Sequence, residues 1–174
     1  MEKTFSIDDP FAFTVCRIEP ENNVHLLLQA FSESPKMLLV IVGNWAYSTY
    51  GKFLKEKYVN SSSVILHDPI YDQQKLNVLR SRCTLYLHGH SCGGTNPSLV
   101  EAMYLGLPIA AYDCNFNRET TENHALYFKS AEELNEIIHL STADQLYFIA
   151  KSMKTVADRR YTWKRIAKCY ACIL

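Results

Sequence analysis

The chain has 174 residues, 48% of them hydrophobic, and carries 18 Lys or Arg against 18 Asp or Glu. This length and apolar content suffice for one folded domain with a sizeable core. The zero net charge argues against nucleic acid and anionic membrane surfaces as partners, because both select a basic excess.

Two further features concern the cellular compartment. No apolar run approaches the roughly 20 residues of a membrane-spanning helix, and the N-terminus lacks a signal-peptide pattern. The six scattered cysteines do not resemble the disulfide framework of a small secreted domain, so reduced thiols in a cytoplasmic protein are expected. They are Cys16, Cys83, Cys92, Cys114, Cys169 and Cys172.

Short apolar runs alternate with segments of helical periodicity along the chain. Residues 1–10 are polar and are expected to be a linker or a frayed N-terminus, before a domain that spans residues 11–174. In chain order the predicted elements are strand Phe11–Cys16, helix Asn23–Ser32, strand Met37–Val42, helix Thr49–Tyr58, strand Val64–His67, helix Asp72–Ser81, strand Thr84–His88, helix Pro97–Leu105, strands Ile109–Tyr112 and Ala125–Phe128, and helices Ala131–His139, Thr142–Ala157 and Thr162–Ile173.

This alternation predicts an α/β fold, a Rossmann-like three-layer α/β/α arrangement with a mostly parallel sheet of about six strands. Several predicted strands are apolar throughout, as expected for strands covered on both faces. Ligands of such sheets bind beyond the carboxyl ends of the strands. That rule selects the loops Arg17–Asn23, Gly43–Ser48, Asp68–Asp72, Gly93–Asn96 and Asp113–Glu119.

The most informative loop lies between the predicted strand ending at His88 and the helix that follows. Asn96 is typical of an N-cap and Pro97 of a first helical turn. Gly93 and Gly94 would let backbone N–H groups approach a ligand at the positive end of the helix dipole, which favours phosphate. The alternative is a tight turn before a well-capped helix.

Two charged residues are expected to lie near this loop in the predicted fold. Arg17 directly follows the first strand and could bind a diphosphate with two parallel hydrogen bonds; the alternative is a surface salt bridge. Glu101 lies one turn into the helix, where its carboxylate could accept two hydrogen bonds from a ribose diol. Its alternative role is simple stabilisation by the helix dipole.

Histidines at the end of the fourth strand admit two interpretations. Alternation would place His88, His90 and Cys92 on one side, which suggests a zinc site. Because only three ligands are local and the spacing is unusual, we favour histidines that donate to a phosphate or a sugar hydroxyl. After the fifth strand, Asn117 and Arg118 could face the same crevice, or could mark a helix start with an Asn cap.

Four segments together resemble the C-terminal, nucleotide-sugar-binding half of a family 4 glycosyltransferase with the GT-B fold. Val15–Val24 resembles the opening G-R-L-x-x-x-K-G, Leu38–Gly43 the second strand, Pro97–Ala111 the segment L-x-E-A-M-A-x-G-x-P-V-V-A, and Tyr161–Tyr170 the closing W-x-x-x-A-x-x-Y. The His-Gly-His-Ser-x-Gly-Gly-Thr-Asn-Pro run is similar to a bacterial branch that builds exopolysaccharide, capsule and lipopolysaccharide and includes rhamnosyltransferases.

The resemblance implies roles for individual residues. Arg17 matches the phosphate-binding arginine and Glu101 the ribose-binding glutamate, whereas Asn22 stands at the family's lysine and Gly93 at its sugar-binding glutamate. His90 and Thr95 are the expected substitutes for that glutamate. Arg17 and His90 are therefore the catalytic candidates, and the substrate-binding candidates are Arg17, Asn22, Ile70, His88, His90, Gly93, Gly94, Thr95, Asn96, Glu101, Asn117 and Arg118.

The resemblance also implies a function. The chain is expected to be the donor-binding domain of a retaining glycosyltransferase that moves a hexosyl or rhamnosyl group from a nucleotide-diphosphate sugar to a surface polysaccharide. Neither a metal nor another cofactor is expected. The N-terminal acceptor domain is absent from these residues, so the fragment alone is expected to be inactive, with membrane contact only through the absent half. A non-catalytic nucleotide-sugar-binding module and a zinc-binding domain are the alternatives.

Overall fold

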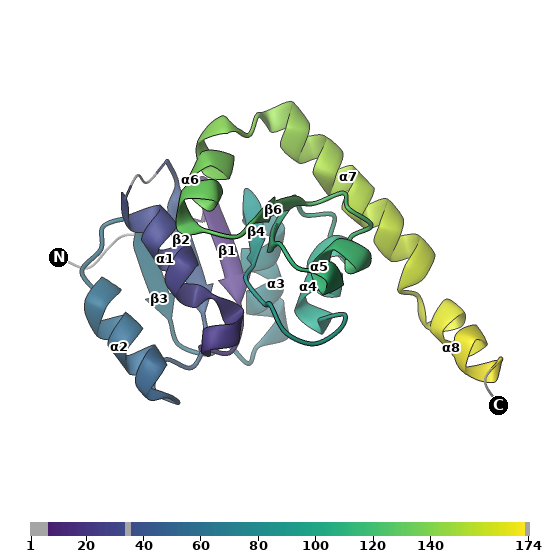
Figure 1. The fold of residues 1–174 in the computed structure, drawn as a ribbon, viewed down its shortest axis with the longest axis horizontal. Coiled ribbons are helices and arrows are strands. Elements are labelled where there is room, and N and C mark those ends of the chain that lie inside the picture. The colour runs from purple at the N-terminus through teal and green to yellow at the C-terminus, as the bar shows by residue number, and fades with distance from the viewer. Residues whose placement is uncertain (1–6, 34–35, 173–174) are drawn as a thin grey trace.

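Six parallel strands form a single sheet in the computed structural model, which describes residues 7–33 and 36–172 (Figure 1). The order across the sheet is β3-β2-β1-β4-β5-β6, and every neighbouring pair is parallel. The strands are β1 (Phe11–Val15), β2 (Leu38–Val42), β3 (Val64–His67), β4 (Leu85–His88), β5 (Ile109–Tyr112) and β6 (Leu126–Phe128). The predicted α/β fold is confirmed.

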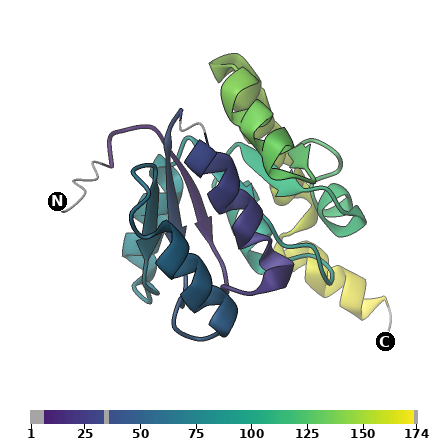
Figure 2. The same ribbon diagram turned by 60° about the vertical axis from the view of Figure 1, so that its left-hand side comes forward.

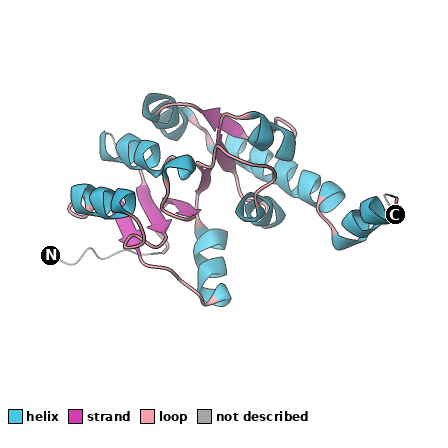
Figure 3. Cartoon of the chain, turned by 60° about the horizontal axis from the view of Figure 1, so that its bottom comes forward, coloured by secondary structure: helices cyan, strands magenta, loops and turns pink. Residues whose placement is uncertain are grey.

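Helices lie on both faces of this sheet, which explains why the strands are mostly apolar (Figure 3). One face packs against α1 (Val24–Glu33), α2 (Thr49–Tyr58) and α6 (Ala131–Leu140). The other packs against α3 (Gln73–Arg82), α4 (Pro97–Tyr104) and α7 (Ala143–Arg160).

Strand β1 shows how the two layers are built. Ala12 points into the first layer, while Phe11 and Phe13 are fully buried in the second. Each fully buried phenylalanine contributes about 1.5–3 kcal/mol of transfer free energy. The alternating side chains therefore anchor both helical layers, and the carboxyl end of β1 is held at the centre of the sheet edge, between β2 and β4.

Two short helices were not among the predicted elements, although a helix start at Asn117 was one interpretation of the segment after β5. A 3-10 helix, η1 (Pro20–Asn22), follows β1, and α5 (Asn115–Thr120) follows β5. Neither is long enough to show a helical repeat of apolar residues. Asn117 lies inside α5 and does not cap it.

The C-terminal helix α8 (Trp163–Ala171) extends away from the sheet beyond the end of α7 (Figures 1 and 2). Its predicted end, Ile173, lies outside the described residues, as do residues 1–6 of the predicted linker. None of the helices within residues 7–33 and 36–172 is both long and apolar enough to cross a membrane. The cysteines whose side chains are described, namely Cys16, Cys83, Cys92, Cys114 and Cys172, are free thiols.

Candidate functional site

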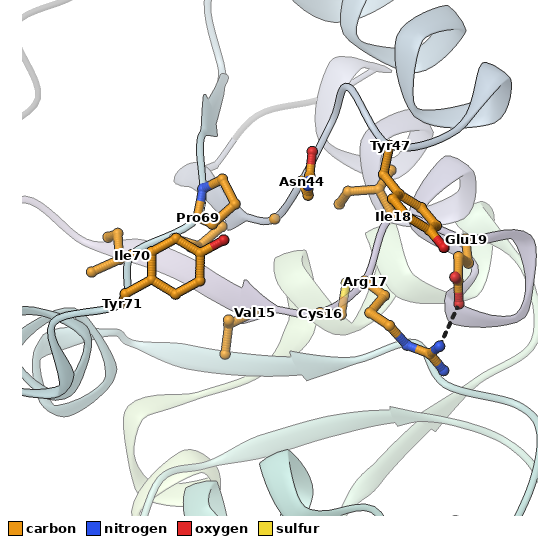
Figure 4. Close-up of a pocket in the computed structure, with 12 residues that line it drawn as sticks. Val15, Cys16, Arg17, Ile18, Glu19, Asn44, Tyr47, Pro69, Ile70 and Tyr71 are labelled. Carbon is orange, nitrogen blue, oxygen red and sulfur yellow. Dashed lines mark ion pairs between the residues drawn. The ribbon is translucent and has the colours of Figure 1, made fainter.

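Two adjoining cavities lie at the carboxyl edge of the sheet, where the topology predicts a ligand site. The first, the β1–β3 cavity, has a volume of about 350 Å³ and is lined by the loops after β1, β2 and β3 (Figure 4). The second, the β1–β4 cavity, has a volume of about 310 Å³ and is lined by the ends of β1 and β4 and the start of α4. Both volumes lie at the lower end of the range for ligand sites. The two cavities share Val15, Cys16 and Arg17.

Arg17 occupies the boundary between the two cavities. Its side chain is 74% exposed, and its Nη1 lies 3.3 Å from Oε2 of Glu19 (Figure 4). Glu19 is only 18% exposed and its Oε2 is buried, so the pair is open to water on the arginine side alone. The exposed guanidinium can face an anionic ligand in either cavity.

The start of α4 forms one wall of the β1–β4 cavity. Asn96 caps this helix as predicted, because its Oδ1 accepts hydrogen bonds from the Ser98 backbone N–H at 3.0 Å and from Ser98 Oγ at 2.9 Å. Asn96, Pro97 and Ser98 all line the cavity. The positive end of the helix dipole therefore faces the same space as Arg17.

Glu101 also lines the β1–β4 cavity and is held by a residue that the sequence did not suggest. Arg80 of α3 is 5% exposed and donates through Nη2 to Glu101 Oε2 at 2.5 Å. Its Nη1 lies 3.3 Å from Asn77 Oδ1 on the same helix. The carboxylate is half exposed, so one oxygen is oriented by Arg80 while the group still faces the cavity.

Asn22 is buried beneath the same cavity, with both polar atoms of its side chain engaged inside the protein. Nδ2 donates to the Arg17 carbonyl oxygen at 2.9 Å, and Oδ1 lies 2.9 Å from Nδ1 of His90. Asn22 stands at the family's lysine and was expected to bind the substrate. Its side-chain amide is instead engaged within the protein and is not free to bind a ligand. It connects the loop after β1 to the loop after β4.

His88 and His90 both line the β1–β4 cavity, and His88 is the more buried of the two. His88 is 4% exposed, and its buried Nε2 has no hydrogen-bond partner among the described residues. Burial lowers the pKa of its imidazole to about 3, so the ring is neutral at physiological pH. The two rings meet edge to face, with 6.1 Å between centroids.

The alternation that suggested zinc ends with β4 at His88, and Cys92 is exposed. Within residues 7–33 and 36–172, no three His, Cys, Asp or Glu side chains are grouped so that they could hold a metal ion. The structure therefore does not assemble His88, His90 and Cys92 as a metal centre.

The glycine loop borders the site but does not line either cavity. Gly93 and Gly94 lie in the turn before α4, and Thr95 Oγ1 lies 3.2 Å from Thr120 Oγ1 of α5. Gly93 has φ +81°, a conformation that L side chains rarely adopt. A glutamate at position 93 would therefore be strained in this loop.

Two predicted ligand residues lie outside both cavities. Asn117 is buried, and its Nδ2 donates to the His90 and Tyr112 carbonyl oxygens, each at 2.8 Å. Arg118 pairs with Asp113 at 2.5 Å and stacks over the Tyr127 ring. Their polar groups are used to fix loops, so the structure does not bring them to the site.

The β1–β3 cavity contains the predicted residue Ile70 together with side chains from two predicted ligand loops that were not named individually. Tyr47 and Tyr71 are both largely exposed and border it, and Asn44 lies between them (Figure 4). Their positions in loops after β2 and β3 were the available signal, because ligand loops of such sheets follow strands. Arg80, by contrast, lies within a helix and gave no local signal.

The unusual backbone of Gly93 leads to a stability prediction. Gly93→Ala is expected to lower the free energy of unfolding by about 1–2 kcal/mol, because alanine must adopt a left-handed conformation. Gly94→Ala is the matched control, since an added Cβ there meets nothing within 4 Å. Urea denaturation of both variants measures the difference, and equal stability of the two would contradict the strained geometry.

Residues 2–157 match the family described as "Glycosyl transferases group 1". No curated protein matches the chain. Among solved structures, sucrose-phosphate synthase from Thermosynechococcus elongatus has a TM-score of 0.82 at 20% identity, over 97% of this chain and 45% of that chain. HepE of Anabaena, solved with UDP-glucose, has a TM-score of 0.79 at 20% identity, over 95% and 49%.

A third structure differs from these in length. The C-terminal domain of the group 1 glycosyl transferase LpcC from Francisella tularensis has a TM-score of 0.72 at 16% identity, over 89% of this chain and 87% of that chain. The chain thus spans about half the length of the first two proteins and most of the third. These similarities show the fold, and the match over residues 2–157 shows that the chain belongs to the family of group 1 glycosyl transferases.

Proposed function

We propose that this chain is the donor-binding domain of a retaining glycosyltransferase that transfers a sugar from a nucleotide-diphosphate sugar to a surface-polysaccharide acceptor. One observation carries the proposal: Arg17, the N-terminus of α4 and Glu101 all line the β1–β4 cavity. A cation and a helix N-terminus suit a diphosphate, and a half-exposed carboxylate beside them suits a ribose diol. Retention, hexosyl or rhamnosyl specificity and the polysaccharide acceptor rest on the sequence resemblance.

The two cavities suit different parts of such a donor. The diphosphate would bind Arg17 and the first N–H groups of α4, and Glu101 would accept hydrogen bonds from the ribose. The base would lie in the β1–β3 cavity near Ile70, where apolar side chains gather. UDP and UDP-glucose are bound by HepE in its solved complexes, which makes uridine nucleotides the first probes to use.

The chemistry demanded of this domain is stabilisation of the charge that develops on the departing diphosphate. Arg17 is permanently charged and offers several N–H donors to the phosphate oxygens. The N–H groups at the start of α4 add a fixed positive dipole. The proposal assigns no role to a metal ion or to another cofactor, and it places the protein in the cytoplasm.

Binding of nucleotides to Arg17→Ala tests the proposal. Thermal unfolding with UDP, dTDP and GDP, each alone and as a sugar conjugate, should show stabilisation of the wild type by at least one nucleotide. Loss of one charge-assisted interaction, about 1.5–3 kcal/mol, predicts binding to Arg17→Ala that is roughly 10- to 100-fold weaker.

Arg159→Ala is the matched control, because this arginine is also exposed but lies on α7 and pairs with Glu122. It should bind nucleotide as the wild type does. Wild-type protein that is stabilised by none of the nucleotides would contradict the donor site.

A non-catalytic nucleotide-sugar-binding module is a second candidate. It is favoured by Gly93, which carries no carboxylate, and by Asn22, whose side chain is engaged internally. A transfer assay on the full-length protein with its N-terminal half separates the two. Binding of the nucleotide sugar with no transfer to any acceptor would support the module.

A further inference from the structure

We propose that Asn22 is a positioning residue that fixes the tautomer of His90, so that Nε2 of the imidazole accepts a hydrogen bond from a hydroxyl of the donor sugar. The role of Asn22 stands on geometry alone, whereas the role of Nε2 rests on the proposed function. This assigns Asn22 a task different from ligand binding, and gives His90 a defined chemical state.

The orientation of the Asn22 amide follows from its two neighbours. The carbonyl oxygen of Arg17, 2.9 Å away, can only accept a hydrogen bond, so the atom facing it must be the amide nitrogen. The amide oxygen then faces Nδ1 of His90 at 2.9 Å. Since an amide oxygen can only accept, Nδ1 must carry the hydrogen.

A neutral imidazole with its hydrogen on Nδ1 has its lone pair on Nε2. In this protein Nε2 lies beside the glycine loop, because a Cβ built on Gly93 would be 4.0 Å from it. His90 also lines the β1–β4 cavity. The acceptor atom is therefore placed between the cavity and the loop that precedes α4.

The backbone around His90 is held by hydrogen bonds to two other loops. Asn117 Nδ2 donates to the His90 carbonyl oxygen at 2.8 Å, the Ser91 N–H donates to Glu21 at 2.9 Å, and Asn23 Nδ2 donates to Gly89 at 2.9 Å. The loops after β1 and β5 therefore fix the loop after β4, which keeps the backbone of His90 close to Asn22. A preorganised acceptor loses little entropy on binding.

The lone pair selects the kind of ligand group. Phosphate oxygens are acceptors, so they would face a neutral Nε2 unfavourably, whereas a sugar hydroxyl can donate to it. With the diphosphate at Arg17 and the start of α4, the sugar is the part of the donor that offers such hydroxyls. We therefore assign the Nε2 contact to a donor-sugar hydroxyl.

The tautomer can be measured without any ligand. Long-range ¹H–¹⁵N spectra of the histidine rings, at a pH where His90 is neutral, should show the wild-type hydrogen on Nδ1. Asn22→Leu should lose this preference, and His90→Gln identifies the signal. Asn135→Leu is the matched control, because that half-buried amide also donates to a backbone carbonyl, that of Ala30 at 2.9 Å, but is remote from His90.

Folding of each variant is checked by circular dichroism, and Asn22→Ser provides a smaller change should Asn22→Leu fail to fold. A wild-type hydrogen on Nε2, or an unchanged tautomer in the folded Asn22 variant, overturns the positioning role. Altered tautomer in Asn135→Leu would likewise show that the effect is not specific to Asn22.

Ligand affinities test the hydroxyl contact. UDP is compared with UDP-glucose, dTDP with dTDP-glucose and GDP with GDP-mannose in wild type, Asn22→Leu and His90→Phe. Loss of one neutral hydrogen bond predicts roughly 2- to 10-fold weaker binding of the sugar conjugate, with little change for the bare nucleotide.

The role of Asn22 and the contact between His90 Nε2 and a sugar hydroxyl can be overturned independently. If no nucleotide binds the wild type, the proposed function and the hydroxyl contact fall together, while the tautomer result still decides the role of Asn22. If nucleotides bind and the sugar contribution is the same in all three proteins, the hydroxyl contact alone is overturned.

Discussion

Gly89→Ala is expected to lower the free energy of unfolding by about 3 kcal/mol, the upper range for overpacking a tight site. An added Cβ would lie 2.2 Å from the Asn22 carbonyl oxygen and 3.2 Å from its carbonyl carbon. These are backbone atoms, and they cannot rotate away as the end of a side chain could. The loops after β1 and β4 would have to separate. Guanidinium denaturation followed by circular dichroism measures the loss.

Gly94→Ala again serves as the control, since its Cβ would meet nothing within 4 Å. Separation of the loops should also disrupt the contact between Asn22 and His90, so His90 should show the altered tautomer in Gly89→Ala. Equal unfolding midpoints for the two alanine variants would contradict the close approach of Gly89 to Asn22.

The ion pair between Arg80 and Glu101 is expected to respond unequally to removal of its two partners. Glu101→Leu leaves a buried guanidinium without its carboxylate and should cost about 2–3 kcal/mol. Arg80→Leu leaves a carboxylate that water can reach, and should cost about 1 kcal/mol or less. The double variant should be about as stable as Arg80→Leu alone, a coupling of about 2–3 kcal/mol.

Lys154 and Asp158, an exposed pair on α7 at 2.7 Å, provide the control cycle. Water screens this pair, so its coupling should stay below about 0.5 kcal/mol. The free energies of unfolding are measured by urea denaturation. If the loss in the double variant equals the sum of the losses in Arg80→Leu and Glu101→Leu, the two side chains do not stabilise each other.

The same variants test the proposed role of Glu101 toward ribose. Wild-type protein should bind UDP roughly tenfold more tightly than 2′,3′-dideoxy-UDP, because the dideoxy ligand lacks the hydroxyls that would donate a charge-assisted hydrogen bond to Glu101. Glu101→Leu should bind the two ligands alike. Arg80→Leu should retain part of the preference, since the carboxylate remains but loses its fixed orientation. Wild-type protein that does not distinguish the ligands would contradict the contact with ribose.

Local sequence patterns predicted the features that depend on local physics. The six strands were evident because a strand covered on both faces is mostly apolar, and Leu38–Val42 is apolar at every position. The cap at Asn96 was evident because capping is decided within three residues. The placement of Arg17 near the start of α4 followed from topology, since parallel strands end at the same edge.

Contacts between distant residues were decided only by the tertiary structure. Asn22 and His90 are 68 residues apart, and Arg80 and Glu101 are 21 apart on different helices. No periodicity within either segment encodes such a pair. For Asn117, the sequence position after β5 suggested a contact with a ligand. In the folded protein its side chain instead donates to the His90 and Tyr112 carbonyl oxygens.

The amino-acid sequence by itself thus determined the doubly covered parallel sheet, the capped helix α4 and the edge at which a ligand site lies. Apolar periodicity, capping and strand polarity are local properties, and they suffice for these features. Only the tertiary structure decided which polar atoms remain available at that edge. Asn22 is engaged by Arg17 and His90, because each buried polar group must find a partner wherever the folded loops bring one.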